Sequence, residues 1–473
     1  MRILKWRILF TFVFSTLTLL VLWTPCQWAL MDDPTVYLTV HSLVAHFGVF
    51  SGAAKFLKFS YLEGLSVGRF RPAYWIYQLI FYEFNGNPKV AYLLRIGMLA
   101  CSSILPVLWL EKRQAIKFGS IRPLLLILFL SSIFANYALW DGLIYISLQE
   151  LSGIFCVSLI FSVVPVNPKE LSSVKIAWSI FFLILGTFFK EPFIWVIFTF
   201  SFFLFYLQKR KMAIMTVLFG LVALSIILVV SKQGSYTKRA FSFDVERVWL
   251  SAKDFLFFGK YTLLIWLISL LTLGKLKFEE IDKTTCAFAL SLVLASGLYL
   301  LNVIIWGGSL YHWSPVLWLG SVGIFTLVAE GSKDQKFTIK PKYKLLVIII
   351  SVLCSFRVIF NKAKYFYLSN RGVSHLIDWT HSQSLADQEN ICTTGIEMAV
   401  TLPELSAIKN KSNTNFTYKR MTYFDMSNHS SNHCKYIISY EDQLPVLKEQ
   451  TRFVKTIDFG GGLILIRDAN EPN

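Results

Sequence analysis

Two adjacent carboxylates, Asp32 and Asp33, follow the first long apolar stretch of the chain and precede Pro34. Ionised groups are expensive to place near a bilayer, so an acidic pair in this position indicates a functional site. Adjacent carboxylates repel each other, which favours retention of a proton by one of them and suits the pair to proton transfer. The alternative is structural, because Asp-Asp-Pro also fits the start of a helix.

Arginine and aromatic residues follow the acidic pair. Arg69 and Arg71 lie at the entry to the segment 71–84, which is rich in Tyr and Trp but too short to cross a membrane comfortably. Such a segment is predicted to form a helix at the membrane interface, where aromatic side chains favour the headgroup region. The two arginines are suited to bind phosphate, or they extend to lipid headgroups without any further role.

The composition identifies the class of protein that must position these groups. The chain has 473 residues, of which 55% are hydrophobic and 16% charged, and its mean hydropathy is +0.55. These values are typical of a polytopic membrane protein. The net charge of +17 does not indicate nucleic-acid binding, because Lys and Arg occur in short clusters between apolar runs, as in cytoplasmic loops.

About eleven membrane-spanning helices are predicted from the apolar runs. The loops richest in Lys and Arg alternate with loops that have almost none, which places the N-terminus in the cytosol and the segments 31–88, 231–256 and the tail outside it. The apolar runs are 8–29, 89–110, 123–139, 143–164, 174–189, 192–207, 212–230, 257–274, 284–305, 313–329 and 344–360.

The tail from about residue 361 is more polar, so we predict a membrane domain at 1–360, with an outer loop at 31–88, and a small extracytoplasmic α/β domain at 361–473. Cys392 and Cys434 can form a disulfide there if the tail is outside the cytosol. The tail is predicted to contain helices at 372–380 and 398–408, a strand at 436–440 and a hairpin of 454–459 with 463–467.

Two motifs resemble a known superfamily. Gly68-Arg69-Phe70-Arg71-Pro72, with aromatics and Asn85-Gly86-Asn87-Pro88 after it, is similar to the Tyr-Arg-Pro…Phe-Gly-x-Asn-Pro stretch of O-mannosyltransferase-like enzymes. The segment 136–150 looks like a degraded Thr-Glu…Arg-x-Glu stretch of the same group. Together with the acidic pair and the architecture over about 360 residues, the chain resembles the GT-C superfamily, which includes protein O-mannosyltransferases and aminoarabinose transferases.

The resemblance implies an inverting glycosyltransferase. It would move a sugar from a polyprenyl-phosphate donor to a glycan, lipid or protein acceptor on the non-cytosolic face of the membrane. Asp32 would be the catalytic base, and Asp33 would orient the acceptor or bind a divalent metal; no cofactor is certain. Arg69 and Arg71 would neutralise the departing lipid phosphate.

Four further substrate-binding residues lie in predicted outer connectors. Lys190 and Glu191 form a tight turn where GT-C enzymes often carry a functional Lys or Glu, and Tyr311 and His312 lie at the mouth of a span. His312 departs from the Arg-Tyr or Tyr-Tyr of related enzymes and is suited to bind phosphate or sugar. The alternatives are a neutralised turn between helices for Lys190 with Glu191, and a headgroup neighbour for His312.

Asp141 and Glu150 complete the set of candidates. Asp141 is predicted in an outer turn as a substrate-binding residue, and Glu150 about two turns into a span, facing protein or water. His429 and His433 precede Cys434 at a metal-like spacing, but their Ser- and Asn-rich surroundings favour a solvated loop. The Gly460–Gly462 run lacks a following helix and a Lys, which argues against direct use of a nucleotide sugar or ATP.

Two rival functions remain open. A transporter or flippase of a lipid-linked glycan predicts paired charges in mid-span and broken helices related by a repeat, and the sequence shows neither beyond Glu150. A non-catalytic membrane subunit of the same ancestry would use the acidic pair only as a helix cap. The bias toward Phe, Ile and Lys favours a bacterial inner membrane over the endoplasmic reticulum.

Overall fold

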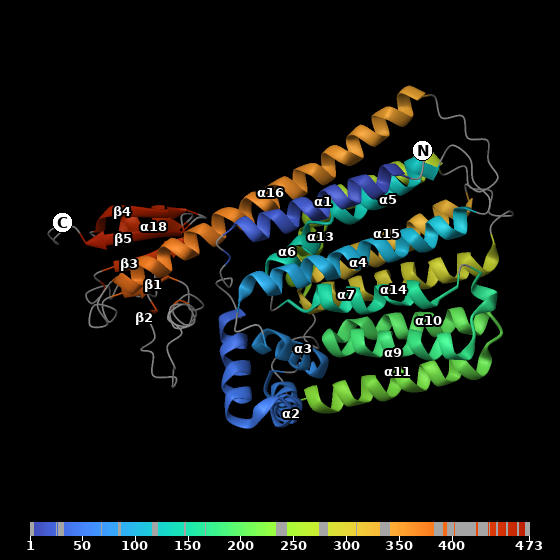
Figure 1. Ribbon diagram of the computed structural model, residues 1–473, viewed down its shortest axis with the longest axis horizontal. Helices are drawn as coiled ribbons and strands as arrows, with labels where there is room; N and C mark the ends of the chain where they lie inside the picture. Colours follow the sequence, from blue (N-terminus) through green and yellow to red (C-terminus); the bar gives the residue numbers. More distant parts are fainter. Residues whose placement is uncertain are drawn as a thin grey trace.

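The chain folds into a bundle of long helices with a small β-sheet near its C-terminus (Figure 1). The computed structural model describes residues 4–24, 26, 33–67, 69–83, 87–115, 122–145, 148–165, 167–232, 244–273, 282–308, 310–331, 341–382, 391–394, 402, 422–423, 434, 436–440, 443–450, 453–460 and 463–468.

Each of the eleven predicted apolar runs overlaps at least one helix of the bundle. This agreement is expected, because in a membrane only a helix satisfies every backbone N–H and C=O within one segment. The bundle helices are α1 (Leu4–Trp23), α4 (Pro88–Ala115), α5 (Arg122–Phe134), α6 (Tyr137–Ile144), α7 (Glu150–Ser158), α8 (Ile160–Val163), α9 (Ser173–Phe189), α10 (Ile194–Tyr206), α11 (Arg210–Ser231), α13 (Val245–Leu273), α14 (Lys283–Trp306), α15 (Trp313–Gly331) and α16 (Pro341–Ser382).

Six of the described helices are long and apolar enough to cross a membrane: α4, α11, α13, α14, α15 and α16. The bent pair of α5 and α6 adds a seventh if the two helices form one span, and four further apolar helices are shorter. The chain is therefore a helical integral membrane protein. The count of about eleven spans remains a prediction.

Two predicted spans, 123–139 and 143–164, are not single straight helices. α5 and α6 meet at an angle of 56°, and the predicted span 143–164 is not continuous, because α6 ends at Ile144 and α7 begins only at Glu150. The break is stabilised by the fully buried Arg95 of α4, which donates to the carbonyl oxygens of Gly142 at 2.8 Å and Tyr145 at 3.3 Å. Carbonyls at a helix end lack partners within the helix, and the guanidinium supplies them.

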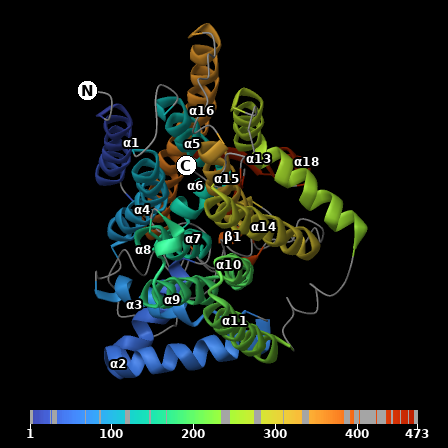
Figure 2. The same ribbon diagram turned by 90° about the vertical axis from the view of Figure 1, so that its right-hand side faces the viewer.

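The predicted outer loop forms two helices at one end of the bundle. α2 (Asp33–Val67) is kinked at Gly48, whose φ is 72°, and α3 (Pro72–Glu83) matches the helix predicted at 71–84. α2 lies crosswise to the bundle helices (Figures 1 and 2). The C-terminal sheet lies at this same end, and the N-terminus lies at the opposite end (Figure 1). The position of α3 at a membrane interface remains a prediction.

α16 runs through the predicted domain boundary. It has 42 residues and continues from the bundle to Ser382, so the change of composition at 360–361 does not interrupt the helix, and the predicted helix 372–380 is its last part rather than a separate element. The predicted helix 398–408 lies almost wholly outside the described residues. The domain boundaries remain predictions.

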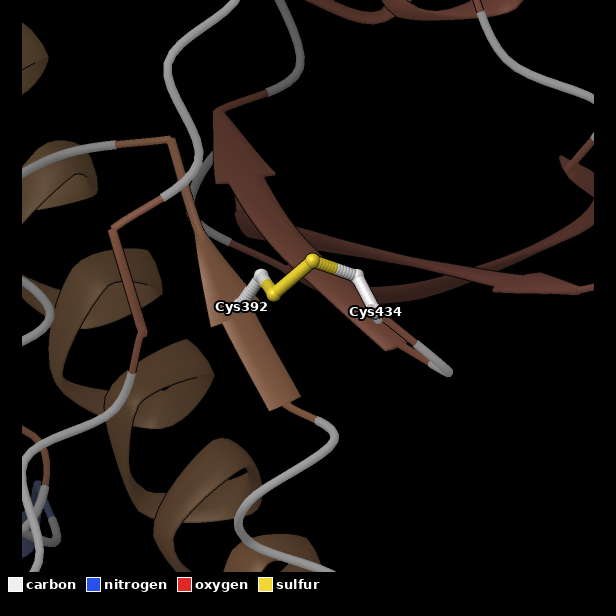
Figure 3. Close-up of a disulfide and its surroundings, with 2 residues drawn as sticks. All are labelled: Cys392 and Cys434. Carbon is white, nitrogen blue, oxygen red and sulfur yellow. A yellow bond between two sulfur atoms is a disulfide. The ribbon is translucent and has the colours of Figure 1, made fainter. Parts of the chain in front are cut away.

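The tail contains a five-stranded sheet in the order β2-β1-β3-β5-β4. β1 pairs in parallel with β2 and β3, and β5 pairs antiparallel with β3 and β4, which confirms the predicted strand and hairpin. Trp379 of α16 packs against Tyr436 and Phe459, and Cys392 forms a disulfide with Cys434 (Figure 3). The elements are β1 (Ile391–Thr393), β2 (Thr422–Tyr423), β3 (Tyr436–Tyr440), α18 (Leu444–Gln450), β4 (Phe453–Gly460) and β5 (Leu463–Asp468).

Candidate functional site

A buried ion pair joins the start of α7 to the end of α9. The Glu150 carboxylate lies 2.8 Å from the Lys190 ammonium, and the side chains are 0% and 6% exposed. Glycines allow this close approach: a Cβ on Gly186 would lie only 3.4 Å from the carbonyl oxygen of Gly153, and a Cβ on Gly153 would collide with the ring of Phe193. The segment that carries Glu150 and the segment that carries Lys190 are thus fixed against each other by close packing.

His312 extends this pair toward the other half of the bundle. Its Nε2 lies 3.9 Å from Oε1 of Glu150, and its ring packs against Trp306 with 4.9 Å between centroids. The Arg69 guanidinium lies 6.0 Å from the centroid of the Trp306 ring. We call Glu150, Lys190, His312 and Arg69 the Glu150 cluster; it contains three basic side chains and one carboxylate.

Burial and neighbouring charges act in opposite directions on Lys190. Burial lowers the pKa of the Lys190 ammonium below its ordinary value, and the adjacent Glu150 carboxylate opposes that shift. Arg69 lowers the pKa of Lys190 further, and Glu191 raises it. Lys190 is therefore within electrostatic range of both Arg69 and Glu191.

Arg71 is held by a residue that the sequence did not single out. Its guanidinium forms an ion pair with Glu63 of α2, and the same carboxylate accepts a hydrogen bond from the indole N–H of Trp75 at 2.8 Å. Burial alone would lower the pKa of Arg71, but Glu63, Tyr74 and Glu191 raise it above the ordinary value. Arg71 therefore remains charged, and it lies within electrostatic range of Glu191.

The buried polar atoms near the cluster that have no hydrogen-bond partner among the described residues include Oε1 of Glu191 and the hydroxyl of Tyr299. The Tyr299 hydroxyl interacts electrostatically with both Glu150 and Glu191. Buried polar groups in proteins are nearly always paired, so unpaired ones beside a charge cluster indicate a place that a ligand or water completes.

Most of the predicted binding residues therefore come together. Lys190 and His312 contact Glu150, Tyr311 packs on the His312 ring at 4.3 Å between centroids, and Arg69, Arg71 and Glu191 are linked to Lys190 or to one another electrostatically. The turn at Lys190 is not neutralised within itself by Glu191, because the carboxylate in contact with Lys190 is that of Glu150.

Asp141 does not join this group, and its predicted position is wrong. It lies within α6, where it is 4% exposed, rather than in an outer turn, and it forms an ion pair with Lys362 of α16. Glu150 also differs from its predicted position, because it is the first residue of α7 instead of lying two turns into a span. Both differences follow from the bends that separate α5, α6 and α7.

The predicted acidic pair cannot be placed next to the cluster. Asp32 lies outside the described residues, and Asp33 begins α2 although its side chain is not described. His429 and His433 also lie outside them. In the part of the chain that is described, no group of three or more His, Cys, Asp or Glu could hold a metal ion, so the possible metal of Asp33 remains a proposal.

Four functional or positioning residues were missed by sequence reasoning: Glu63, Arg95, Tyr299 and Lys362. Arg95 had a usable signal, because an arginine inside the apolar run 89–110 requires partners within the protein. Glu63 and Lys362 lie in mixed sequence where a single charge is unremarkable, and their partners are distant in the chain.

No family model matches the chain, and no curated protein matches it. Among solved structures, the crystal structure of ArnT from Cupriavidus metallidurans bound to undecaprenyl phosphate is similar over 99% of both chains, with 12% sequence identity and a TM-score of 0.48.

Proposed function

We propose that this chain is a GT-C type glycosyltransferase that transfers a sugar from a polyprenyl-phosphate donor to an acceptor on the non-cytosolic face. One observation carries the proposal: Lys190 and His312 approach the Glu150 carboxylate within the helical bundle, and Arg69 lies within electrostatic range of Lys190. Charged side chains that are buried in or beside a membrane are expensive and mark sites of function.

The cluster has the charge that a departing lipid phosphate requires. Negative charge develops on the phosphate as the bond to the sugar breaks, and fixed cations in a poorly solvated site stabilise it most effectively. Arg69 and Arg71 enter from the loop between α2 and α3, whereas Lys190 and His312 come from turns within the bundle. Cations from separate segments can surround a phosphate instead of contacting one side of it.

The acidic pair has the complementary role. Asp32 takes the proton from the attacking hydroxyl or amine of the acceptor, and the lipid phosphate leaves from the opposite side of the anomeric carbon, so the configuration inverts. Asp33 orients the acceptor or holds a divalent metal. The Glu150 carboxylate is already engaged by Lys190, which makes it a positioning group rather than a base.

Replacement of both aspartates tests the proposal. In purified full-length protein reconstituted into liposomes, D32N/D33N should lose transfer from a polyprenyl-phosphate sugar while keeping its binding to the donor. D244N is the matched control, because Asp244 precedes α13 and its Oδ1 caps the backbone N–H groups of Glu246 and Arg247, a role that Asn retains. Full transfer by well-folded D32N/D33N would refute the assignment.

A second function is favoured by one observation. The bend between α5 and α6 and the break before α7 place buried charges beside interrupted helices, an arrangement typical of transporters. A flippase would move a fluorescent lipid-linked glycan across proteoliposomes without acceptor and without chemical change. Transfer chemistry without such movement supports the glycosyltransferase, and movement without chemistry supports the flippase.

A further inference from the structure

Two basic side chains lie on the outside of the helical bundle. Lys260 of α13 and Arg357 of α16 are both exposed, although each lies within a helix that is long and apolar enough to cross a membrane. Ionisable side chains in such helices usually face the bundle interior and pair with other groups. These two face outward, and among the residues that the structure describes no carboxylate forms an ion pair with either of them.

α5 fixes the two helices that carry these cations at the same level. The Thr262 hydroxyl of α13 donates to the backbone carbonyl of Ser132 at 3.2 Å, and the Ser355 hydroxyl of α16 donates to that of Ser131 at 2.9 Å. All four residues are buried. Thr262 and Ser355 are each two positions from the exposed cation of their own helix, so neighbouring carbonyls of α5 bring the two cations to one level.

Tyr261 is close to both cations. The centroid of its ring lies 5.4 Å from the Lys260 ammonium and 6.0 Å from the central carbon of the Arg357 guanidinium. The same ammonium lies 4.0 Å from the ring centroid of Phe257, one turn earlier in α13. An aromatic face attracts a cation but carries no net charge. The two positive charges are therefore held near each other without being neutralised.

The surroundings of the two cations are apolar. The same two helices expose large hydrophobic side chains on both sides of the level of Lys260 and Arg357. These side chains are Phe257, Leu264, Leu353, Phe356 and Phe360. Positive charge flanked by exposed apolar side chains matches a lipid, whose headgroup is polar and whose chains are not.

The predicted spans 257–274 and 344–360 give an expected depth for the cations. Lys260 follows the start of the first span by three residues, and Arg357 precedes the end of the second by three, so each lies about one turn inside the predicted non-cytosolic surface. Long basic side chains reach the headgroup region from that depth. Lys364, exposed two turns beyond Arg357 on the same face of α16, adds positive charge near that surface.

We propose that the face formed by α13 and α16 around Tyr261 binds an anionic phospholipid. Its phosphate lies between Lys260 and Arg357, and its acyl chains lie against the exposed apolar side chains. A phosphate has oxygens on opposite sides, so it accepts from both cations at once. A zwitterionic headgroup would add an ammonium beside two cations, which is unfavourable. The proposal does not rest on the glycosyltransferase assignment, because none of these residues belongs to the Glu150 cluster and binding is measured directly.

Lipid binding to the purified full-length chain in detergent tests the proposal. Native mass spectrometry measures the apparent Kd for phosphatidylglycerol and for phosphatidylcholine with the same acyl chains. Each cation beside an anionic headgroup favours binding about five-fold, so phosphatidylglycerol should be preferred by about 25-fold. K260Q/R357Q should lose this preference, whereas K260R/R357K keeps both charges and should retain most of it. An unchanged preference in K260Q/R357Q would overturn the proposal.

The matched control is R210Q/K211Q. It also removes one Arg and one Lys from exposed positions, in this case at the start of α11, and it should keep the full preference for phosphatidylglycerol. If R210Q/K211Q lost as much of the preference as K260Q/R357Q, the attraction would be a general effect of basic charge, and the proposed site would be refuted.

Photolabelling locates the lipid independently of the variants. Phosphatidylglycerol with a diazirine in its acyl chain should label α13 and α16, and unlabelled phosphatidylglycerol should remove this labelling more effectively than a polyprenyl phosphate does. Competable labelling that maps only to other helices would contradict the site. Stronger competition by the polyprenyl phosphate would also overturn the proposal, because the face would then bind the donor type of lipid instead of a phospholipid.

Discussion

The Glu150 carboxylate lies 2.8 Å from the Lys190 ammonium, and the two residues are 40 positions apart in the chain. Both side chains are almost fully buried, so neither charge has solvent to replace its partner. The pair joins the first residue of α7 to the turn that follows α9, and His312 approaches the same carboxylate oxygen from η4 (Leu310–His312). The ion pair therefore joins the segments that form the Glu150 cluster and also contributes to the charge of the cluster.

Loss of one partner should destabilise the protein far more than loss of both. K190M leaves the Glu150 carboxylate buried without its ammonium, and such a change is expected to reduce the free energy of unfolding by about 3–5 kcal/mol. E150L/K190M removes both charges and should recover most of that loss. Denaturant unfolding in detergent, followed by tryptophan fluorescence, measures the three proteins.

An exposed lysine is the control for that experiment. Lys169 lies in the exposed 3₁₀ turn Pro168–Glu170, so K169M should leave the free energy of unfolding within about 0.5 kcal/mol of wild type. If K190M were no less stable than K169M, the pair would not hold α7 against α9.

Gly153 should be intolerant of even one methyl group. A Cβ at this position would collide with the ring of Phe193, which follows the Lys190 turn, so G153A must push the turn away from Glu150. Overpacking of this kind is expected to cost about 1–3 kcal/mol. The control is G97A, since a Cβ on Gly97 of α4 meets nothing within 4 Å; Ala there should be neutral or slightly stabilising. Similar thermal midpoints for the two variants would contradict the packing argument.

Glu63 should act on the donor through Arg71. In E63Q the guanidinium loses its charged partner while Gln can still accept from Trp75, so the helices should remain packed and Arg71 should lose its fixed orientation. Because hydrogen bonds to charged groups are worth about 1.5–3 kcal/mol, we expect the KM for the lipid donor to rise about ten-fold with little change in kcat. K58Q, at an exposed position of the same helix, should leave both constants unchanged. A fall in kcat alone would assign Glu63 a different role.

The helices could be predicted because their signal is local. An apolar run long enough to cross a bilayer has few alternatives to a helix, and the hairpin between β4 and β5 follows from two short apolar strands around glycines. The run 143–164 is equally apolar, yet its helix is interrupted between Ile144 and Glu150, where Arg95 of α4 binds the carbonyl oxygens of Gly142 and Tyr145. That contact crosses about fifty positions, and no pattern within the run contains it.

The sequence predicted which residues belong to the site, but it did not predict which of them form ion pairs with one another. Lys190 and His312 were identified from their positions in predicted outer connectors and from the GT-C resemblance. The sequence offered Glu191 as the partner of Lys190, whereas the structure pairs it with Glu150. Asp141 was placed in a turn because it follows Trp140 between two apolar runs, whereas Lys362 neutralises it inside the bundle. Ion pairing between distant segments depends on helix packing, which a single sequence does not specify.

The disulfide gives a prediction that also tests the side of the membrane. Cys392 and Cys434 are separated by 42 residues, and in the chain-entropy account a loop of this length stabilises the folded state by about 4 kcal/mol. C392S/C434S should therefore expose β1 and β3 to proteolysis and amide exchange. C354S should not, because Cys354 of α16 is a free thiol in the structure.

If the tail is extracytoplasmic, protein from cells whose thiols were blocked before lysis should carry the Cys392–Cys434 pair oxidised, because disulfides persist in oxidising compartments. Recovery of both thiols in the blocked, reduced form would place the tail in the cytosol and would reverse the orientation on which the outer position of Asp32 and Asp33 depends.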